Sequence, residues 1–303
     1  MSTSPEQAYD LGEIPSARAM GMGDALNALG VSTTALYLNP ANMPLARVYH
    51  IESLAALSPE AQRQTYGLAI VDSVLNGGRI SGGAGGAWSQ MDTGDKGLHR
   101  VWSDVRAAIA LPLGDYVALG ATGRWLRVEQ AVGAGPLGNS LASGGTASGP
   151  LVNAFTFDAG ATASLGDSLR IAVAGHNLTN PGTALAPLSG VAGIGYGTQT
   201  FAVEADAMLD FTTYGSTQSR FMFGGELFLA DHYALRAGWR YDTGSRLHTP
   251  SVGFGYIDPR WSIELAARHD IASEHASTFA VLSLRYFYDA TGASTPADQP
   301  DTF

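Results

Sequence analysis

The chain has 303 residues, a formal net charge of −10, no cysteine and a charged fraction of only 15%. The absence of cysteine excludes disulfide bonds, thiolate zinc sites and a cysteine nucleophile. A single lysine, Lys96, and scattered arginines leave no basic patch that could neutralise phosphates, so nucleic acid is excluded as a partner. No stretch approaches eighteen consecutive apolar residues, which excludes a transmembrane helix.

The chain begins with MSTSPEQAYDLGE, which has neither the basic region nor the apolar core of a signal peptide. Because the later segments predict an exported protein, we expect that a signal peptide was removed. The following stretch, 17–43, is apolar and contains Gly21, Gly23 and Gly30 and a turn at Asn39-Pro40. Glycines allow close backbone approach and positive φ, so this stretch predicts a compact, irregular plug rather than a solvated tail.

From residue 47 onwards the sequence alternates between apolar and polar residues in segments that end at Gly, Asp, Asn or Pro, which predicts strands and turns. We predict fourteen strands, at 47–57, 63–73, 78–91, 98–111, 116–128, 151–164, 168–177, 189–197, 200–211, 218–229, 232–242, 248–257, 260–270 and 277–289.

Alternation alone also fits a soluble β-sandwich with its apolar face inside. Three features favour a transmembrane barrel instead. Aromatic residues collect at strand ends, short and long connections alternate, and most strands have the length that a tilted strand needs to cross a bilayer. An unpaired strand edge in hydrocarbon is costly, so we predict an all-β fold, an antiparallel barrel of about 14 strands closed around an N-terminal plug.

The polar face of these strands carries charges of both signs, which we expect to line the lumen. Opposite charges in a narrow lumen pair rather than conduct, and general porins usually have sixteen to eighteen strands, so open diffusion of hydrophilic solutes is disfavoured. The expected lumen charges are Asp104, Arg106, Arg124, Asp158, Arg170, Glu204, Asp206, Glu226, Arg236, Arg240, Glu264, Arg268 and Arg285.

No set of residues indicates catalysis. The seven histidines show neither the HExxH motif nor i, i+4 pairing, and the one GAGPLG stretch lies in a loop with no helix after it. We therefore expect no enzymatic activity, no cofactor and no metal site.

Two regions resemble the FadL-like outer-membrane transporter superfamily, and most of all its PorV-like branch. The first runs from Ala17 to Met43 and contains RAMGMGDA and ALYLNPA; the second comprises FGGELFLADHYALRAGWRYDTGS and the closing SLRYFY. The resemblance implies that the N-terminal segment is a hatch inside the barrel. It also implies that hydrophobic molecules such as fatty acids pass through a side opening at a kink in the third strand. The expected hatch residues are Arg18, Met20, Gly21, Met22, Gly23, Asn39 and Pro40.

The third predicted strand contains Gly82, Gly83, Gly85 and Gly86. Interior glycines weaken a strand and mark bends or bulges, and these fall where the resemblance places the opening, so we expect a gate here. The alternative is that small residues let the wall pack tightly against the hatch without any opening.

We therefore expect three parts: a hatch (1–45), a 14-stranded outer-membrane barrel (46–289) and a disordered periplasmic tail (290–303). The expected function is passive uptake of a fatty-acid-like hydrophobic molecule through a lateral opening. The alternative is a non-transporting PorV-like barrel that anchors a secretion, motility or surface-attachment assembly, and the Gly/Ala/Ser-rich loop 129–150 favours it because such a loop captures hydrophobic ligands poorly. Expected partners are outer-membrane lipid, a fatty-acid-like ligand or detergent inside the barrel, and, for the alternative, a larger envelope complex.

Overall fold

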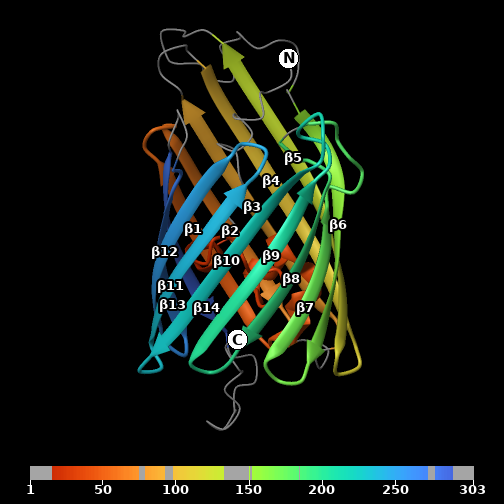
Figure 1. Ribbon diagram of the computed structural model, residues 1–303, viewed down its shortest axis with the longest axis vertical. Coiled ribbons are helices and arrows are strands. Elements are labelled where there is room, and N and C mark those ends of the chain that lie inside the picture. The colour runs from red at the N-terminus through yellow and green to blue at the C-terminus, as the bar shows by residue number, and fades with distance from the viewer. Residues whose placement is uncertain are drawn as a thin grey trace.

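The computed structural model describes residues 16–74, 79–92, 98–132, 150, 152–183, 185–271 and 277–288. The expected tail, 290–303, and the first part of the expected hatch, 1–15, lie outside the described residues. Fourteen antiparallel strands follow one another around a closed barrel, and β1 pairs with β14 to complete it (Figure 1). The strands are β1 (Tyr49–Ser58), β2 (Arg63–Asp72), β3 (Ser81–Asp92), β4 (Leu98–Leu113), β5 (Val117–Val132), β6 (Val152–Leu165), β7 (Leu169–His176), β8 (Ser189–Gly197), β9 (Phe201–Asp210), β10 (Gln218–Leu229), β11 (Tyr233–Asp242), β12 (Leu247–Ile257), β13 (Trp261–His269) and β14 (Thr278–Phe287).

The predicted fold class and strand number are confirmed, and strand ends agree within a few residues. The largest difference is β5, which we predicted to end at 128 and which continues to Val132. It continues because β4 pairs with it along its whole length, from Leu98 opposite Val132 to Leu113 opposite Val117. A cross-strand partner keeps the ladder regular through the polar residues Glu129 and Gln130.

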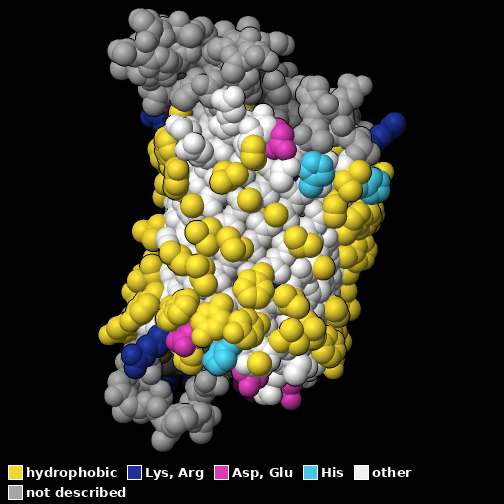
Figure 2. Space-filling model, turned by 90° about the vertical axis from the view of Figure 1, so that its left-hand side faces the viewer, with side chains coloured by type: hydrophobic (Ala, Val, Ile, Leu, Met, Phe, Trp, Pro, Cys, Tyr) yellow, Lys and Arg dark blue, Asp and Glu magenta, His cyan; other side chains and the backbone are white. Residues whose placement is uncertain are grey.

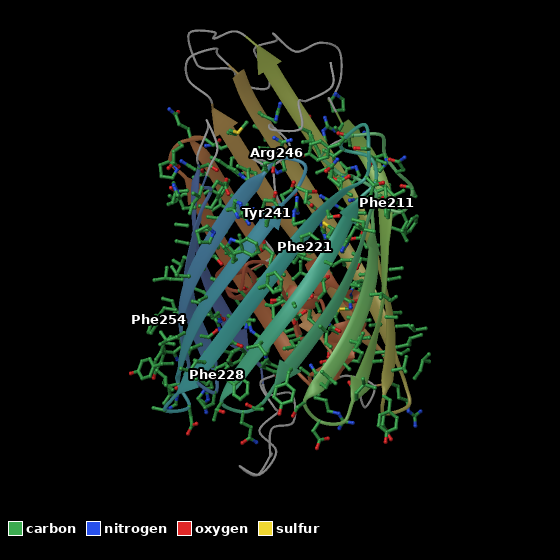
Figure 3. All side chains as sticks on the ribbon, in the orientation of Figure 1. Phe211, Phe221, Phe228, Tyr241, Arg246 and Phe254 are labelled. Atoms are coloured by element: carbon green, nitrogen blue, oxygen red, sulfur yellow. The ribbon has the colours of Figure 1, made fainter. Side chains whose placement is uncertain are left out.

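The outer surface of the barrel is apolar. Leu68, Val203 and Val252 are between 48% and 63% exposed, and they belong to a band of outward aliphatic and aromatic residues that recurs on every strand. Figure 2 shows this apolar surface between two ends where the charged side chains lie, and Figure 3 shows Phe254 directed away from the barrel. An apolar band on a closed barrel is the surface that a lipid bilayer requires. Among the described helices, none is long and apolar enough to cross a membrane.

The two ends of the barrel differ. At one end, here called the turn end, the strands are joined by tight turns such as 114–116, 166–168 and 230–232. At the other end, the loop end, longer connections such as 133–151 and 177–188 join them, and β4 and β5 rise above their neighbours (Figure 1). The predicted alternation of connection lengths holds from β4 onwards, but the β2–β3 connection at the turn end (73–80) is longer than the β1–β2 connection at the loop end (59–62).

The N-terminal segment from Ser16 to Leu45 lies inside the barrel (Figure 1) and forms α2 (Ala17–Gly21), α3 (Thr33–Leu38) and the 3₁₀ helix η1 (Pro40–Leu45). Ser16 caps α2 by accepting the Ala19 N–H, and Asn39 caps η1 by accepting the Ala41 N–H, each at 3.1 Å. The three helices contact different walls: α2 contacts β11–β14, α3 contacts β1–β4 and η1 contacts β3–β6. The segment therefore reaches across the lumen.

The inner wall approaches this segment closely where it carries glycine. Gly23 has a φ of +66°, and a Cβ on Gly238 of β11 would lie 2.1 Å from the Gly23 nitrogen. Likewise, a Cβ on Gly224 of β10 would lie 2.4 Å from the Met22 carbonyl oxygen. These wall glycines are needed because the backbone of the hatch occupies the space of a side chain.

Candidate functional site

Ion pairs tie the N-terminal segment to the strands around it. Arg18 of α2 donates to Glu226 of β10 at 2.7 Å, and Glu226 also pairs with Arg236 of β11. Arg236 also pairs with Glu264 of β13, with 2.6 Å between its Nη1 and the Glu264 Oε2. Glu226 and Glu264 are almost fully buried, so each depends on these guanidinium groups to compensate its lost hydration.

Two further clusters extend the ionic lining. Asp24 of the segment accepts from Arg240 at 2.8 Å and from Arg268 at 3.0 Å. On β4 and β5, Asp104 bridges Arg106 at 3.0 Å and Arg124 at 2.8 Å. The remaining predicted lumen charges also lie on the inner side: Asp158 lies 3.6 Å from Arg106, Arg285 lies 3.1 Å from Glu52, and Arg170 is half-buried near the turn end.

Glu204 and Asp206 of β9 bind the backbone of the hatch directly. Glu204 accepts the N–H groups of Ala28 at 2.5 Å and Leu29 at 2.8 Å. Asp206 accepts the backbone N–H of Asn27 at 3.1 Å and its side-chain amide at 2.7 Å. Three successive N–H groups thus point at two neighbouring carboxyl groups, which fixes residues 27–29 of the hatch to β9.

The other expected hatch residues fix the segment through packing and hydrogen bonds. Met20 packs with Leu54 and Phe279, and Met22 packs with Leu26 and Leu29. Gly21 approaches Gly253, Asn39 donates to Thr162 at 3.0 Å, and Pro40 lies against Gly120.

A cavity of about 40 Å³ lies on the β2–β5 side of the lumen, towards the loop end. Its floor includes Tyr37 of α3, and its wall includes Trp102, Asp104, Arg124 and Leu126. The Arg106 guanidinium stacks over the Tyr37 ring at 5.0 Å, so the floor is fixed to the wall. This cavity is the candidate functional site.

An apolar cluster closes the cavity on its loop-end side. Trp102 (7% exposed) and Leu126 (3%) pack with Val128, Met91 and Ala61. The cluster also contains Ala186 and Leu185 from the β7–β8 connection. Arg63 lies over the Trp102 ring at 4.8 Å. The site therefore combines an apolar roof with an ionic and aromatic floor.

The glycines of β3 do not form an opening in this structure. Over the described parts of β2, β3 and β4, pairing continues in register on both sides, with Gly82 opposite Asp72 and Gly86 opposite Leu68. This pairing contradicts the predicted kink at Gly82, Gly83, Gly85 and Gly86. Gly83 and Gly85 fit the tight-packing alternative, whereas a Cβ on Gly82 or Gly86 would meet only atoms of β4, at 3.5 Å or more. A Cβ on Gly85 would lie 2.8 Å from a Leu36 methyl group, and one on Gly83 would lie 3.2 Å from the Met43 sulfur. The wall needs small residues here because the hatch lies directly against it.

Sequence reasoning missed Tyr37, Trp102, Leu126 and Leu185 as residues of one site. The alternation places Trp102 and Leu126 on inward-facing positions, which is a detectable signal. No local pattern connects them with Leu185, since that residue lies in a connection. Among the described residues, no three His, Cys, Asp or Glu side chains are grouped so that they could hold a metal ion.

No protein-family model and no curated protein matches this sequence. Solved structures match its fold. The CymD monoaromatic hydrocarbon channel has 16% identity and a TM-score of 0.66, with 89% of this chain and 96% of that chain covered. The toluene transporter TbuX of Ralstonia pickettii has 15% identity and a TM-score of 0.63, with 93% and 100% covered. A Pseudomonas aeruginosa FadL homologue has 15% identity and a TM-score of 0.61, with 92% and 99% covered.

At these identities the likeness concerns the fold. The chain is a closed 14-stranded antiparallel barrel of the kind found in FadL-type hydrocarbon transporters. CymD and TbuX are named as a channel and a transporter, and the expectation that this chain is no enzyme stays a prediction. The particular resemblance to the PorV-like branch stays a prediction.

Proposed function

We propose that this protein is a bacterial outer-membrane channel for the passive uptake of a hydrophobic small molecule. The observation that carries the proposal is the luminal cavity, which lies between an apolar roof at the loop end and the hatch below. Two proteins of the same fold, which match 89% and 93% of this chain, are named as a monoaromatic hydrocarbon channel and a toluene transporter. The apolar outer band supports a position in the outer membrane, with the loop end facing outwards.

In the proposed route, the ligand leaves water at the roof, occupies the cavity beside Trp102 and Tyr37, and leaves the lumen when the hatch or the wall moves. The lumen charges named above are paired with one another, and in the proposed function small hydrophilic solutes do not pass. A lateral exit beside β3 is part of the proposal. It requires the ladder with β2 or β4 to part, which the glycine-rich strand makes easier because glycines contribute no side-chain packing across the sheet.

The test is uptake into cells that lack other hydrophobic channels. With the chain expressed in the outer membrane, labelled toluene or a medium-chain fatty acid should enter faster than in cells with an empty vector, whereas labelled arabinose should not. A Leu126→Asp variant should lose the uptake because it places a carboxylate in the cavity wall, and Gln64→Asp, on the outer rim, should retain it. Equal uptake of arabinose and toluene would contradict the proposal.

A second candidate is the accessory barrel that anchors an envelope assembly. It is favoured by the unbroken pairing of β3 and by the small volume of the cavity. Purification from native membranes under mild conditions separates the two: stable recovery with large envelope proteins, together with absent uptake, would support the accessory role.

A further inference from the structure

The β7–β8 connection is held over the mouth of the lumen by one asparagine. Asn177, with a φ of +54°, follows β7 directly. Its side-chain oxygen accepts from Arg124 of the cavity wall at 2.9 Å, and its side-chain amide donates to the Pro187 carbonyl at 2.9 Å. Its backbone N–H donates to Asp158 at 2.7 Å. The backbone around Pro187 is therefore fixed relative to the cavity.

The same segment is fixed again at its end. The Leu188 N–H donates to the Thr212 hydroxyl at 2.9 Å, which joins it to the next connection along the loop end. Between these anchors, Ala186 is completely buried in the apolar cluster and Leu185 is half-buried against Trp102 and Leu126. Leu185 also lines the cavity itself.

The size of the cavity makes Leu185 important. The space of about 40 Å³ is enough for water, whereas a protein cavity that binds benzene has a volume of about 150 Å³. The other lining residues are Tyr37 of α3, which the Arg106 guanidinium covers, and residues of β2–β5, whose backbone is held by the barrel ladder. Leu185 is a loop side chain with solvent on one side, so its rotation is the least costly way to enlarge the space.

We propose that Leu185 sets the upper size limit of the hydrophobic ligand that this site admits. This inference rests on the proposed uptake function and adds its size selectivity. Rotation of the Leu185 side chain towards solvent makes room for one aromatic ring or a slender alkyl chain. A fused two-ring hydrocarbon needs more space than this rotation frees, because the rotated side chain still occupies part of the roof beside the anchored Ala186 and Pro187.

The test compares Leu185→Ala, which removes three carbon atoms from the roof, with Leu185→Phe, which fills it. Leu178→Ala is the matched control, since Leu178 belongs to the same connection but is 48% exposed and packs on Gly175 away from the cavity. The probes are toluene and naphthalene. Leu185→Ala should raise the ratio of naphthalene to toluene uptake about tenfold, the discrimination that methylene-sized changes give in an apolar pocket. Leu185→Phe should lower uptake of both, and Leu178→Ala should leave the ratio unchanged.

A binding measurement on the purified barrel in nanodiscs is independent of transport. Fluorobenzene and fluoronaphthalene are titrated and followed by ¹⁹F NMR, and Leu185→Ala should bind fluoronaphthalene about tenfold more tightly than the wild type does. If the wild type takes up toluene but Leu185→Ala keeps the wild-type ratio, the size limit lies elsewhere and the uptake function stands. If neither the wild type nor any variant transports toluene or naphthalene but Leu185→Ala gains fluoronaphthalene binding, the proposed uptake function is wrong and the size limit set by Leu185 holds. Failure of Leu185→Ala to bind fluoronaphthalene overturns the inference.

Discussion

At the scale of single residues, glycine positions decide how closely the hatch can approach the wall. The run at Gly82–Gly86 is visible in the sequence, and so is its unsuitability for a packed strand. The structural role of these glycines cannot be predicted from the sequence, because an interior glycine is equally compatible with a bend and with a close contact. Only the positions of Leu36 and Met43 distinguish the two, and they lie in a segment with no sequence pattern that fixes its register against β3.

Gly238 provides a sharper test of the same idea. We expect Gly238→Ala to destabilise the protein by about 1–3 kcal/mol, the usual cost of overpacking, because the new Cβ would lie 2.1 Å from the Gly23 nitrogen. Gly225→Ala is the control, since its nearest neighbours lie 3.9 Å away on the outer face. Urea unfolding in detergent micelles measures both variants. Equal midpoints would show that the hatch does not occupy this position.

At the scale of elements, the hatch is an irregular segment whose stability comes from its partners rather than from its own short helices. Glu226 binds both Arg18 and Arg236. Sequence analysis placed Arg18 in the hatch and Glu226 in the lumen but could not pair them, since the pairing follows from closure of the barrel.

Glu226→Ala should therefore cost about 3–5 kcal/mol, because it removes the carboxylate that binds the buried Arg18 and one of the two carboxylates that pair with the buried Arg236. Arg127→Ala, which breaks an ion pair whose arginine is largely exposed, should cost about 1 kcal/mol or less. Thermal unfolding followed by electrophoretic mobility compares the two. Limited proteolysis of the N-terminal segment then shows whether Glu226→Ala releases the hatch.

A second element-scale prediction concerns the lateral exit. Tyr66 and Trp88 pair across β2 and β3 and both face outwards, and the chain has no cysteine of its own. Oxidation of a Tyr66→Cys, Trp88→Cys double variant should reduce uptake, because it holds the two strands together, and a thiol reductant should restore uptake. An Ile263→Cys, Leu284→Cys pair across β13 and β14 is the control. Uptake that is indifferent to oxidation at both places would exclude parting of β2 and β3.

At the scale of the whole molecule, the barrel was predictable and the cavity was not. Each strand carries its own two-residue period, and closure follows from the cost of an open edge in lipid. The cavity depends on residues such as Trp102 and Leu185, which come into contact only after the sheet has closed. The periodicity of a single strand does not predict such a contact.

The apolar band leads to a prediction for the whole barrel. Val252, near the middle of β12, is 63% exposed on the outer face. Val252→Arg should destabilise the protein in a bilayer by about 2–4 kcal/mol, and Leu229→Arg, at the end of β10, by about 1 kcal/mol or less. Folding titrations in phosphatidylcholine vesicles measure this difference. If both variants cost the same, the band is not the membrane-spanning surface.

The ion pairs of the hatch also constrain the order of folding. Arg18 and Asp24 lie near the start of the chain, whereas Glu226 and Arg268 lie 208 and 244 positions later. Contacts between such distant positions form late, because most of the chain has to be arranged before they can be made. The N-terminal segment, which is synthesised before the strands that hold it, is therefore among the last to reach its final place. Until β10–β13 are in position, its apolar residues such as Met20 and Met22 have no surface to pack against, so we expect a chaperone to protect this segment during folding.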